Sequence, residues 1–554
     1  MDAVEVLVVG AGPTGLVMAA ELLRYGISCR IIEKTGEPSQ LSKAIVIQAR
    51  TLEMFAHLKI AEPFLSEGLI LKGARTISGG REIGHLSFSQ IESEFPFALS
   101  LEQSKTEALL DDALKKRGGQ VERSKELVDF TSQSDGIRAE VQNIVTGEIE
   151  TIRTKYLIGC DGAHSFVRKK LGLTFIGTRF PDVFSLADIH INWQFPHNEI
   201  VAFLDPRGIC AAFPLKEENR YRLLFQLKRL RGVLKDLSEE QHGILPPDAA
   251  AVPTLEEIQK LLHTYAGPGA DAYNPVWLGN FHINSRLTSR YRVGNVFLAG
   301  DAGHVHSPIG GQGMNTGILD AFNLAWKLAL VVEGRAKEEL LDTYESERHR
   351  FAGKLLKGTR RLTTLATLEN RILIRMRNFV VQHVMHSRPR QRKVARALSQ
   401  TGLVYPRGVL VQETGRTTTG PHAGERAPNT YVTYQGKRVM LASLWQNCTG
   451  FVLLVFDDKN FIDFAHPLCP ISIVVAKSPR LSENGWAIVH DATGSARQAY
   501  GVTGPCAFII RPDLMIGLRQ TPVQVEGLTS YFQTWVADGS VARQKEKESH
   551  RKSA

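Results

Sequence analysis

The sequence predicts an α/β protein: a Rossmann-type nucleotide-binding domain that carries an inserted antiparallel β-sheet domain and is followed by another β-rich domain. Three observations predict this fold. Residues 4–33 have the pattern of strand, tight turn, helix and strand. Residues 184–226 hold several short apolar runs separated by turn residues. From Gly402 onward the composition shifts to Gly, Pro and Thr before new apolar runs begin. At 554 residues, the chain is too long for one hydrophobic core.

The first motif is the glycine-rich turn in VVGAGPTG, where Gly10, Gly12 and Gly15 have the G-x-G-x-x-G spacing. It follows an expected strand and precedes an expected helix over residues 16–25. Gly10 permits the tight turn, Gly12 lets the backbone approach a pyrophosphate, and Gly15 allows close helix packing. The helix N-terminus then faces the phosphates, which predicts a dinucleotide site.

The next expected strand ends at Glu33, followed by Lys34. A carboxylate at this place suits the adenosine ribose hydroxyls, so both residues are candidate cofactor contacts. This first motif does not separate NAD from FAD.

The second motif, NVFLAGDAGHVHSPIGGQGMN, indicates a flavin. An apolar strand ends at Asp301, whose carboxylate suits a ribityl hydroxyl, although a helix cap is an alternative role. A glycine-rich loop then leads to a helix expected to start near Gly313 or Met314. Its exposed amides suit the pyrimidine edge of a flavin, where negative charge accumulates on reduction. The candidate contacts in this loop are Pro308, Gly310, Gly311, Gln312, Gly313, Met314 and Asn315.

The third motif is LIGCDGAHSFVRKKLG, residues 157–172. Asp161 ends another apolar strand, Ser165 is expected to cap the next helix, and Arg168 could meet a phosphate. An ordinary strand-to-helix turn is the alternative interpretation.

Together, G-x-G-x-x-G…E, D-G-x-x-S-x-V-R and G-D-A-x-H…P-x-G-G-Q-G-M-N resemble the single-component flavoprotein aromatic hydroxylases, the p-hydroxybenzoate hydroxylase superfamily. ARTLEMF (residues 49–55) and LEQSKTEALL (residues 101–110) add to the resemblance. The sequence of residues 490–519 is similar to the C-terminal part of one branch of this family. That branch hydroxylates phenols and polyketides and carries a C-terminal thioredoxin-like domain. The motifs are specific over residues 1–350 and looser over 415–535.

The resemblance implies a glutathione-reductase-like FAD-binding domain. Gln103 would contact the ribityl chain, and Asp161 and Arg168 would serve the region where FAD and the nicotinamide cofactor meet. Pro308 and Gly311 would lie beside the isoalloxazine ring. Where the family often has Arg-Ala, this chain has Lys43-Ala44. Lysine keeps the charge but loses the planar fork, so Lys43 is either a flavin contact or a solvated surface residue.

The activity implied by the resemblance is monooxygenation. NADH or NADPH would reduce FAD, O2 would give a 4a-hydroperoxyflavin, and one oxygen would pass to an aromatic, phenolic or polyketide-like small molecule. Epoxidation, Baeyer-Villiger oxidation and antibiotic-inactivating hydroxylation are alternatives on the same fold. A non-catalytic binding protein is a further alternative, although it would not need Asp301 and the G-G-Q-G-M-N loop.

The substrate is expected between the flavin loop and the inserted sheet. Core aromatics on alternating strands would give the same pattern. His304 and His306 are interpreted as packing or hydrogen-bonding residues rather than members of a catalytic triad. The candidate lining residues are Ile45, Ile47, Phe203, Phe213, Pro214 and Phe225.

The predicted domain bounds are residues 1–180 for the first part of the FAD-binding domain, with some substrate-domain strands near 70–105, and 181–267 for the substrate-binding β-sheet domain. Residues 268–400 would return to the FAD-binding domain and its long basic helices, 405–540 would form the thioredoxin-like domain, and 541–554 a disordered tail. The six cysteines contain no C-x-x-C pair, so the thioredoxin-like domain is expected to be structural and no metal site is expected.

The net charge of +10 is concentrated between Arg350 and Arg396, where thirteen Lys or Arg residues face one acid, Glu369. The favoured interpretation is a long helix with one buried face and a solvated basic face. Weak contact with an anionic membrane surface is the alternative. No nucleic-acid-binding module is recognisable. We expect a cytoplasmic protein, monomeric or homodimeric, whose partners are an aromatic substrate and O2.

Overall fold

The structure is a computed structural model of the whole chain. It describes residues 3–38, 44–206, 208–226, 243–244, 251–308, 310–415, 419–458, 462, 464–478 and 486–537. Lys43 and the predicted tail, residues 541–554, lie outside the described residues.

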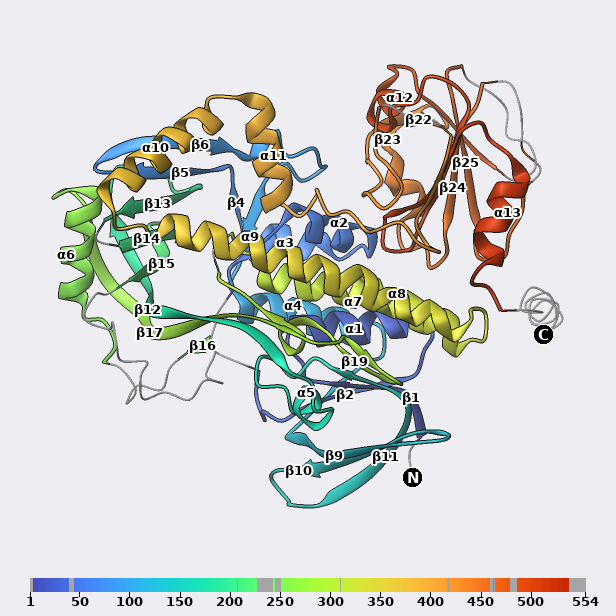
Figure 1. Cartoon of the computed structure of the whole chain (residues 1–554), viewed down its shortest axis with the longest axis horizontal. Helices are drawn as coiled ribbons and strands as arrows, with labels where there is room; N and C mark the ends of the chain where they lie inside the picture. The colour runs from blue at the N-terminus through green and yellow to red at the C-terminus, as the bar shows by residue number, and fades with distance from the viewer. Residues whose placement is uncertain are drawn as a thin grey trace.

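The first sheet has a parallel core that confirms the predicted α/β fold (Figure 1). Helix α1 (Pro13–Arg24) follows the first strand directly, three residues earlier than the expected start at Leu16, because Pro13 occupies the first turn, where proline needs no N–H partner. The parallel strands are, in order, β19 (Val296–Leu298), β11 (Ile149–Gly159), β1 (Ala3–Val9), β2 (Cys29–Glu33) and β8 (Val121–Arg123).

The second sheet is the inserted one, and it is largely antiparallel. Its two longest strands, β12 (Phe175–Asn192) and β17 (Asp271–Thr288), pair with each other; β12 begins before residue 181, and β17 lies beyond residue 267. Helix α6 (Leu255–Ala266) covers one face and begins with a capping box formed by Thr254 and Glu257. The strands are, in order, β16 (Gly243–Ile244), β17 (Asp271–Thr288), β12 (Phe175–Asn192), β15 (Arg220–Gln226), β14 (Gly208–Pro214), β13 (Glu199–Asp205), β5 (Gly73–Ser78) and β6 (Arg81–Ser87).

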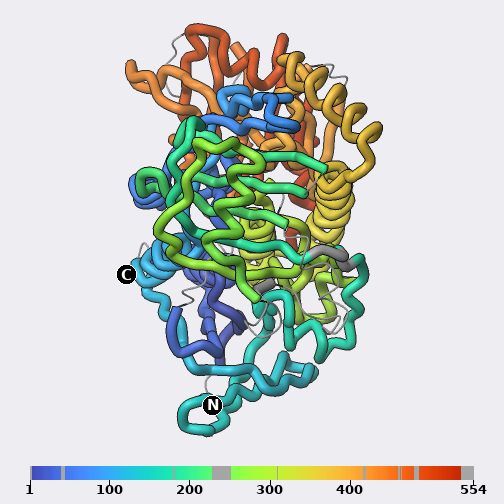
Figure 2. The backbone as a smooth tube through the Cα atoms, turned by 90° about the vertical axis from the view of Figure 1, so that its left-hand side faces the viewer, coloured from blue at the N-terminus to red at the C-terminus, as the bar shows by residue number. Residues whose placement is uncertain are grey.

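The basic segment forms three helices instead of one: α9 (Arg350–Ala366), α10 (Arg371–Met385) and α11 (Arg388–Leu398). They run along one side of the second sheet (Figure 2). Asn370 starts α10 by accepting hydrogen bonds from the amides of Ile372 and Leu373.

The outer face of α10 differs from the expected solvated basic face, because it exposes large apolar side chains. The exposed fractions of Ile372 and Phe379 are 68% and 69%, and Leu373, Met376 and Val380 are exposed beside them. Such a contiguous apolar surface indicates an interaction site.

The third sheet lies at the opposite end of the molecule from α6 (Figure 1). Three of its strands match the predicted apolar runs, β24 (Val452–Phe456), β25 (Ile471–Ala476) and β27 (Cys506–Ile510). No helix among the described residues is long and apolar enough to cross a membrane. The remaining strands are β21 (Gln412–Thr414), β22 (Tyr431–Tyr434), β23 (Lys437–Met440), β26 (Ala487–His490) and β28 (Ile516–Gln520).

Candidate active site

A cavity of about 330 Å³ lies between the glycine-rich loops of the first sheet and one face of the second sheet. It collects side chains that are up to three hundred residues apart in the sequence. The loops contribute Gly12, Pro13, Thr14, Cys160, Gly162, Asp301, Val305, His306, Pro308, Gly311, Gln312, Gly313 and Met314. The second sheet contributes Leu186, Phe213, Arg222, Leu224, Phe281, His282 and Ile283, and the segments between contribute Ala44, Ile45, Val46 and Gln103.

The three glycines of the first motif meet different surroundings. A Cβ on Gly15 would lie 1.9 Å from the carbonyl oxygen of Gly10, and Gly10 itself has φ +101°, so both positions require glycine. A Cβ on Gly12 would meet no protein atom within 4 Å. Gly12 therefore leaves space that faces the cavity.

Glu33 ends β2, and its carboxylate accepts hydrogen bonds from the amides of Ala11 and Thr35, at 2.9 and 3.0 Å. It is therefore held against the first glycine turn. Lys34 follows it as an exposed residue.

The second motif is organised by a buried ionic network. Asp320 on α7 (Gly313–Val332) accepts from His304 at 2.8 Å, from Arg348 at 2.6 Å and from the amide of Gly300 at 3.1 Å. His304 is thus a hydrogen-bonding residue, as expected. The network fixes the turn that carries Asp301 against the start of α7.

The loop before α7 is closed by amide side chains. Asn315 donates to the carbonyl oxygens of Val46 and Gly311, both at 2.8 Å, and accepts from the amide of Gln48. Gly310 and Gly311 have φ of +94° and +60°, which glycine adopts without strain. The amides of the first turn of α7 consequently open on the cavity.

Gln103 begins α4 (Gln103–Lys115) and lines the cavity; its carbonyl accepts from the amide of Ala44 at 3.1 Å. Asp161 and Arg168 lie outside the lining. Ser165 caps α5 (Phe166–Lys170), as predicted, and Arg168 donates to the carbonyl oxygens of Ala163 and Ala302, both at 2.9 Å. Burial raises the pKa of Asp161.

Among the candidate substrate residues, only Ile45 and Phe213 line the cavity. Phe203 and Phe225 pack on the other face of the second sheet, against Ile258 and Leu262 of α6, because successive side chains of a strand point to opposite faces. Ile47 belongs to the central core. Pro214 is buried beside the cavity, where its carbonyl accepts from Ser100.

Several polar residues that line the cavity, Arg222 among them, were not predicted from the sequence. Arg222 on β15 forms a buried bidentate ion pair with Asp188 on β12, with N–O distances of 2.6 and 2.7 Å. His306 is buried at the flavin loop, and its Nε2 has no hydrogen-bond partner among the described residues. Burial lowers the pKa of His306 to about 4, so its imidazole is neutral at pH 7. The Arg222–Asp188 pair depends on β12–β15 register, which no local motif signals.

These residues fit FAD. The open side of Gly12, the amides at the start of α7 and the unpartnered nitrogen of His306 all face one cavity. Two glycine-rich helix N-termini offer amides to a diphosphate and to an electron-rich ring edge. The fold and the site define a flavin-dependent oxidoreductase.

Comparison with known proteins supports the assignment as a flavin-dependent oxidoreductase. The FAD binding domain family matches residues 3–359. The 12-dehydrotetracycline 5-monooxygenase/anhydrotetracycline 6-monooxygenase of Streptomyces rimosus is 32% identical over 96% of this chain and 98% of the relative. Pentachlorophenol 4-monooxygenase of Sphingobium chlorophenolicum is 31% identical over 93% of each chain. The solved structure of OxyS anhydrotetracycline hydroxylase from Streptomyces rimosus aligns with a TM-score of 0.74 and 29% identity, covering 97% of this chain and 99% of that one.

The chain therefore belongs to the FAD binding domain family and is a flavoprotein monooxygenase. FAD is its cofactor, with NAD(P)H as the reductant typical of this class.

Proposed function

We propose that this monooxygenase hydroxylates a phenolic or polyketide-like aromatic compound held in the cavity between the flavin loops and the second sheet. The observation that carries the proposal is the composition of the cavity wall. Leu186, Leu224 and Phe281 line it from the second sheet and Gly311 lines it from the flavin loop, while Arg222, paired with Asp188, is its charged lining residue. An apolar slot with a few polar groups suits a flat hydroxylated ring.

Bound FAD supplies the oxygen-transfer chemistry, and the protein orients the reactants and excludes water. Phe213 and Leu224 would hold the ring, and the guanidinium of Arg222 would meet a phenolic or carbonyl oxygen. Neutral His306 would contact the cofactor or the substrate by hydrogen bonding, without adding charge.

For the cofactor, we propose that FAD contacts the residues of the first and second motifs, together with Gln103. Arg168 would act indirectly, by holding the turn at Ala302, and Asp161 by accepting from the amide of Val167 at the start of α5. Lys43 remains a proposed contact. The proposed direct contacts are Gly10, Gly12, Gly15, Glu33, Lys34, Gln103, Asp301, Pro308, Gly310, Gly311, Gln312, Gly313, Met314 and Asn315.

The experiment is a coupled assay on the purified yellow protein. Oxidation of NAD(P)H should accelerate when a suitable phenol or polyketide aromatic is added, and the product should gain one oxygen atom. Oxidation that consumes NAD(P)H but yields only hydrogen peroxide with every aromatic compound would contradict the proposal.

Mass alone does not separate hydroxylation from epoxidation or Baeyer-Villiger oxidation, because each adds one oxygen. Product NMR does, since only hydroxylation keeps the aromatic ring and replaces one ring proton. A lactone or ester product would favour the Baeyer-Villiger alternative.

We also propose the domain division at residues 1–180, 181–267, 268–400 and 405–540, with β12 and β17 of the second sheet reaching beyond the bounds 181–267 and a thioredoxin-like fold in the last part. The pairing supports that fold: β24 is parallel to β25 and antiparallel to β27, which is antiparallel to β28. Without C-x-x-C, this domain would have a structural role.

We propose, finally, that the basic helices touch an anionic membrane surface weakly, in a cytoplasmic protein that is a monomer or homodimer. The support is α10, whose exposed apolar face is bordered by the exposed cations Arg371 and Arg375. An amphipathic helix of this kind binds the interface of anionic bilayers.

A further inference from the structure

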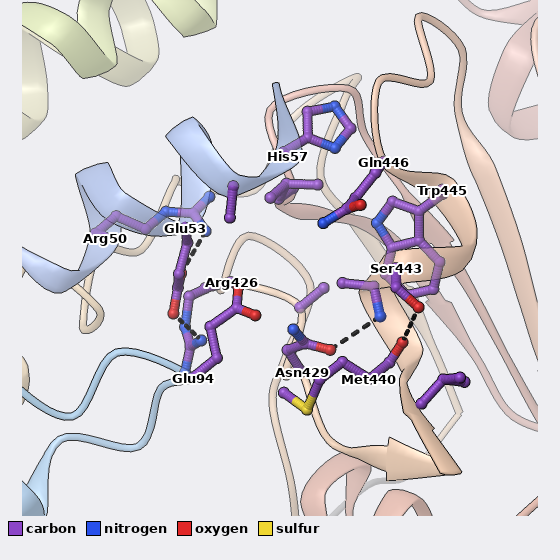
Figure 3. Close-up of a pocket in the computed structure, with 15 residues that line it drawn as sticks. Arg50, Glu53, His57, Glu94, Arg426, Asn429, Met440, Ser443, Trp445 and Gln446 are labelled. Carbon is purple, nitrogen blue, oxygen red and sulfur yellow. Dashed lines mark hydrogen bonds and ion pairs between the residues drawn. The ribbon is translucent and has the colours of Figure 1, made fainter. Parts of the chain in front are cut away.

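A second cavity, of about 350 Å³, lies between helix α2 (Ala49–His57) and the third sheet. It shares no lining residue with the active-site cavity. Figure 3 shows Glu53 and His57 on α2 facing Asn429 and Trp445 of the C-terminal part of the chain.

The ionic part of the wall is complete without a ligand. Glu53 accepts from Arg50 at 2.9 Å, from Arg426 at 2.6 Å and from Ser93 at 2.6 Å. These contacts tie α2 to the C-terminal part. Glu53 therefore has no need of a further cation.

Two buried nitrogen atoms are not satisfied. Trp445 and His57 have exposed fractions of 2% and 5%, and neither Trp445 Nε1 nor His57 Nε2 has a hydrogen-bond partner among the described residues. In Figure 3 the indole nitrogen of Trp445 faces the open middle of the pocket. Buried polar groups are nearly always paired, so unpaired ones that line a cavity indicate a ligand.

Glu94 supplies the opposite polar edge. Burial, with the nearby charge of Glu53, raises the pKa of Glu94 to about 7, while a hydrogen bond from Asn429 opposes the shift. Its carboxyl group can thus donate or accept near neutral pH. Burial likewise lowers the pKa of His57 to about 3, so that imidazole is neutral.

The rest of the wall favours a neutral, flat molecule. Arg50 and Arg426 both donate to Glu53, so the two guanidinium groups are already paired with a carboxylate of the protein. The polar donors and acceptors therefore stand at the edges of an otherwise apolar slot. The apolar surface comes from Ala56, Ala427, Val439, Met440, Ala442 and Leu514.

We propose that this pocket is a second binding site for a small neutral hydroxyaromatic ketone or aldehyde. A carbonyl oxygen of the ligand accepts from Trp445 Nε1, and a hydroxyl group bonds Glu94 or His57. Binding here requires no turnover, so the site does not depend on the proposed reaction.

The test is calorimetric titration of the FAD-loaded protein with dihydroxyacetophenone under air, without NAD(P)H. The Leu224→Trp variant, which fills the active-site cavity, should still bind one molecule per chain. Adding Trp445→Phe to that variant should weaken this binding roughly tenfold, because one hydrogen bond to a buried donor is lost. Ser443→Trp, a change at the exposed rim of the pocket, should abolish it without disturbing the core.

The matched control is Trp535→Phe, added to the same Leu224→Trp variant. Trp535 is also buried with an unpartnered nitrogen, but it belongs to a different core cluster. It should leave the affinity unchanged. Absence of binding in the Leu224→Trp variant, or equal effects of the two tryptophan changes together with no effect of Ser443→Trp, would overturn the proposal. Failure of the hydroxylation assay would not affect it.

Discussion

At the scale of single residues, the glycines of the first motif give opposite predictions for the same substitution. Gly12→Ala should fold normally, because its Cβ meets no protein atom and its backbone is extended, with φ −71°. It should nevertheless weaken FAD binding at least tenfold, because the added methyl group occupies the space where a pyrophosphate approaches. Flavin release on dilution, followed by fluorescence, measures this.

Gly15→Ala is the contrasting variant. Its Cβ would lie 1.9 Å from the carbonyl oxygen of Gly10, so the strand-helix junction must move and the folded protein should be destabilised by several kcal/mol. Equal flavin affinity in Gly12→Ala and wild type would contradict the role given to the open side of Gly12.

Leu224 and Phe225 are neighbours on β15 that face opposite sides of the second sheet. Leu224→Trp should raise KM for the aromatic substrate more than tenfold, because it fills the cavity, while flavin content stays normal. Phe225→Leu should instead lower the free energy of unfolding by about 1–2 kcal/mol with KM unchanged, because it removes packing against α6. Steady-state kinetics and urea unfolding of both variants distinguish the two faces. An equal KM in Leu224→Trp and the wild type would show that Leu224 does not contact the substrate.

The same pair shows what the sequence could and could not predict. Asp301 and the loop to Met314 follow one strand in order, so their position at the cavity was readable from the motif alone. The surroundings of Phe225 were not. The alternation of β15 places Phe225 on the same face as Tyr221 and Leu223, opposite Arg222 and Leu224, but which face α6 covers and which lines the cavity depends on the tertiary packing. Alternation along a strand separates its two faces but does not say which one faces a cavity.

At the scale of elements, α10 shows a similar limit. The basic, helical character of residues 350–396 was clear, but the breaks before α10 and α11 and the direction of the apolar stripe depend on packing against the second sheet. A Cβ on Gly84 of β6 would lie 2.8 Å from Met385, so the inner face of α10 sits close to that strand. Ile372 and Phe379 are left on the outside.

This exposed stripe predicts a lipid-dependent interaction. Phe379→Ser should reduce flotation with phosphatidylserine vesicles several-fold at low salt, because it removes an apolar anchor from the outer face. Raising the salt concentration should weaken binding of the wild type, because the flanking cations are screened. Val145→Ser, at a side chain that is 79% exposed on the far hairpin, is the control. If the wild type did not bind vesicles but self-associated, and Phe379→Ser abolished the self-association, the apolar face of α10 would instead contact a second copy of the chain.

At the scale of the whole molecule, a buried charge network joins the flavin-binding part to the C-terminal part. Glu347 accepts from Arg511 at 2.6 and 2.9 Å and from Lys327 of α7 at 2.8 Å. All three side chains are buried. Arg511 also binds Asp513, whose carbonyl oxygen accepts from Arg50 of α2. Buried charges therefore hold the third sheet to the rest of the molecule. Removing one partner would leave an uncompensated buried charge and destabilise the fold.

The network predicts acid sensitivity with a definite sign. Burial raises the pKa of Glu347, but the charges of Arg511 and Lys327 outweigh burial and bring the pKa down to about 2. A carboxyl group whose pKa is lower in the folded state stabilises the protein above its unfolded pKa, about 4.3, and this stabilisation disappears as the pH falls toward 2. Glu347→Gln should cost about 3–5 kcal/mol at pH 7, because it leaves two buried cations short of a counter-charge.

Urea unfolding at several pH values between 7 and 3 measures both effects. The variant should lack the part of the acid destabilisation that Glu347 contributes, so its stability should approach that of the wild type as the pH falls. Glu338→Gln, at an exposed ion pair with Arg292, should change stability by less than about 1 kcal/mol and keep the wild-type pH dependence. If Glu347→Gln kept the same slope as well, the junction between the two parts would rest on apolar packing rather than on the buried charges.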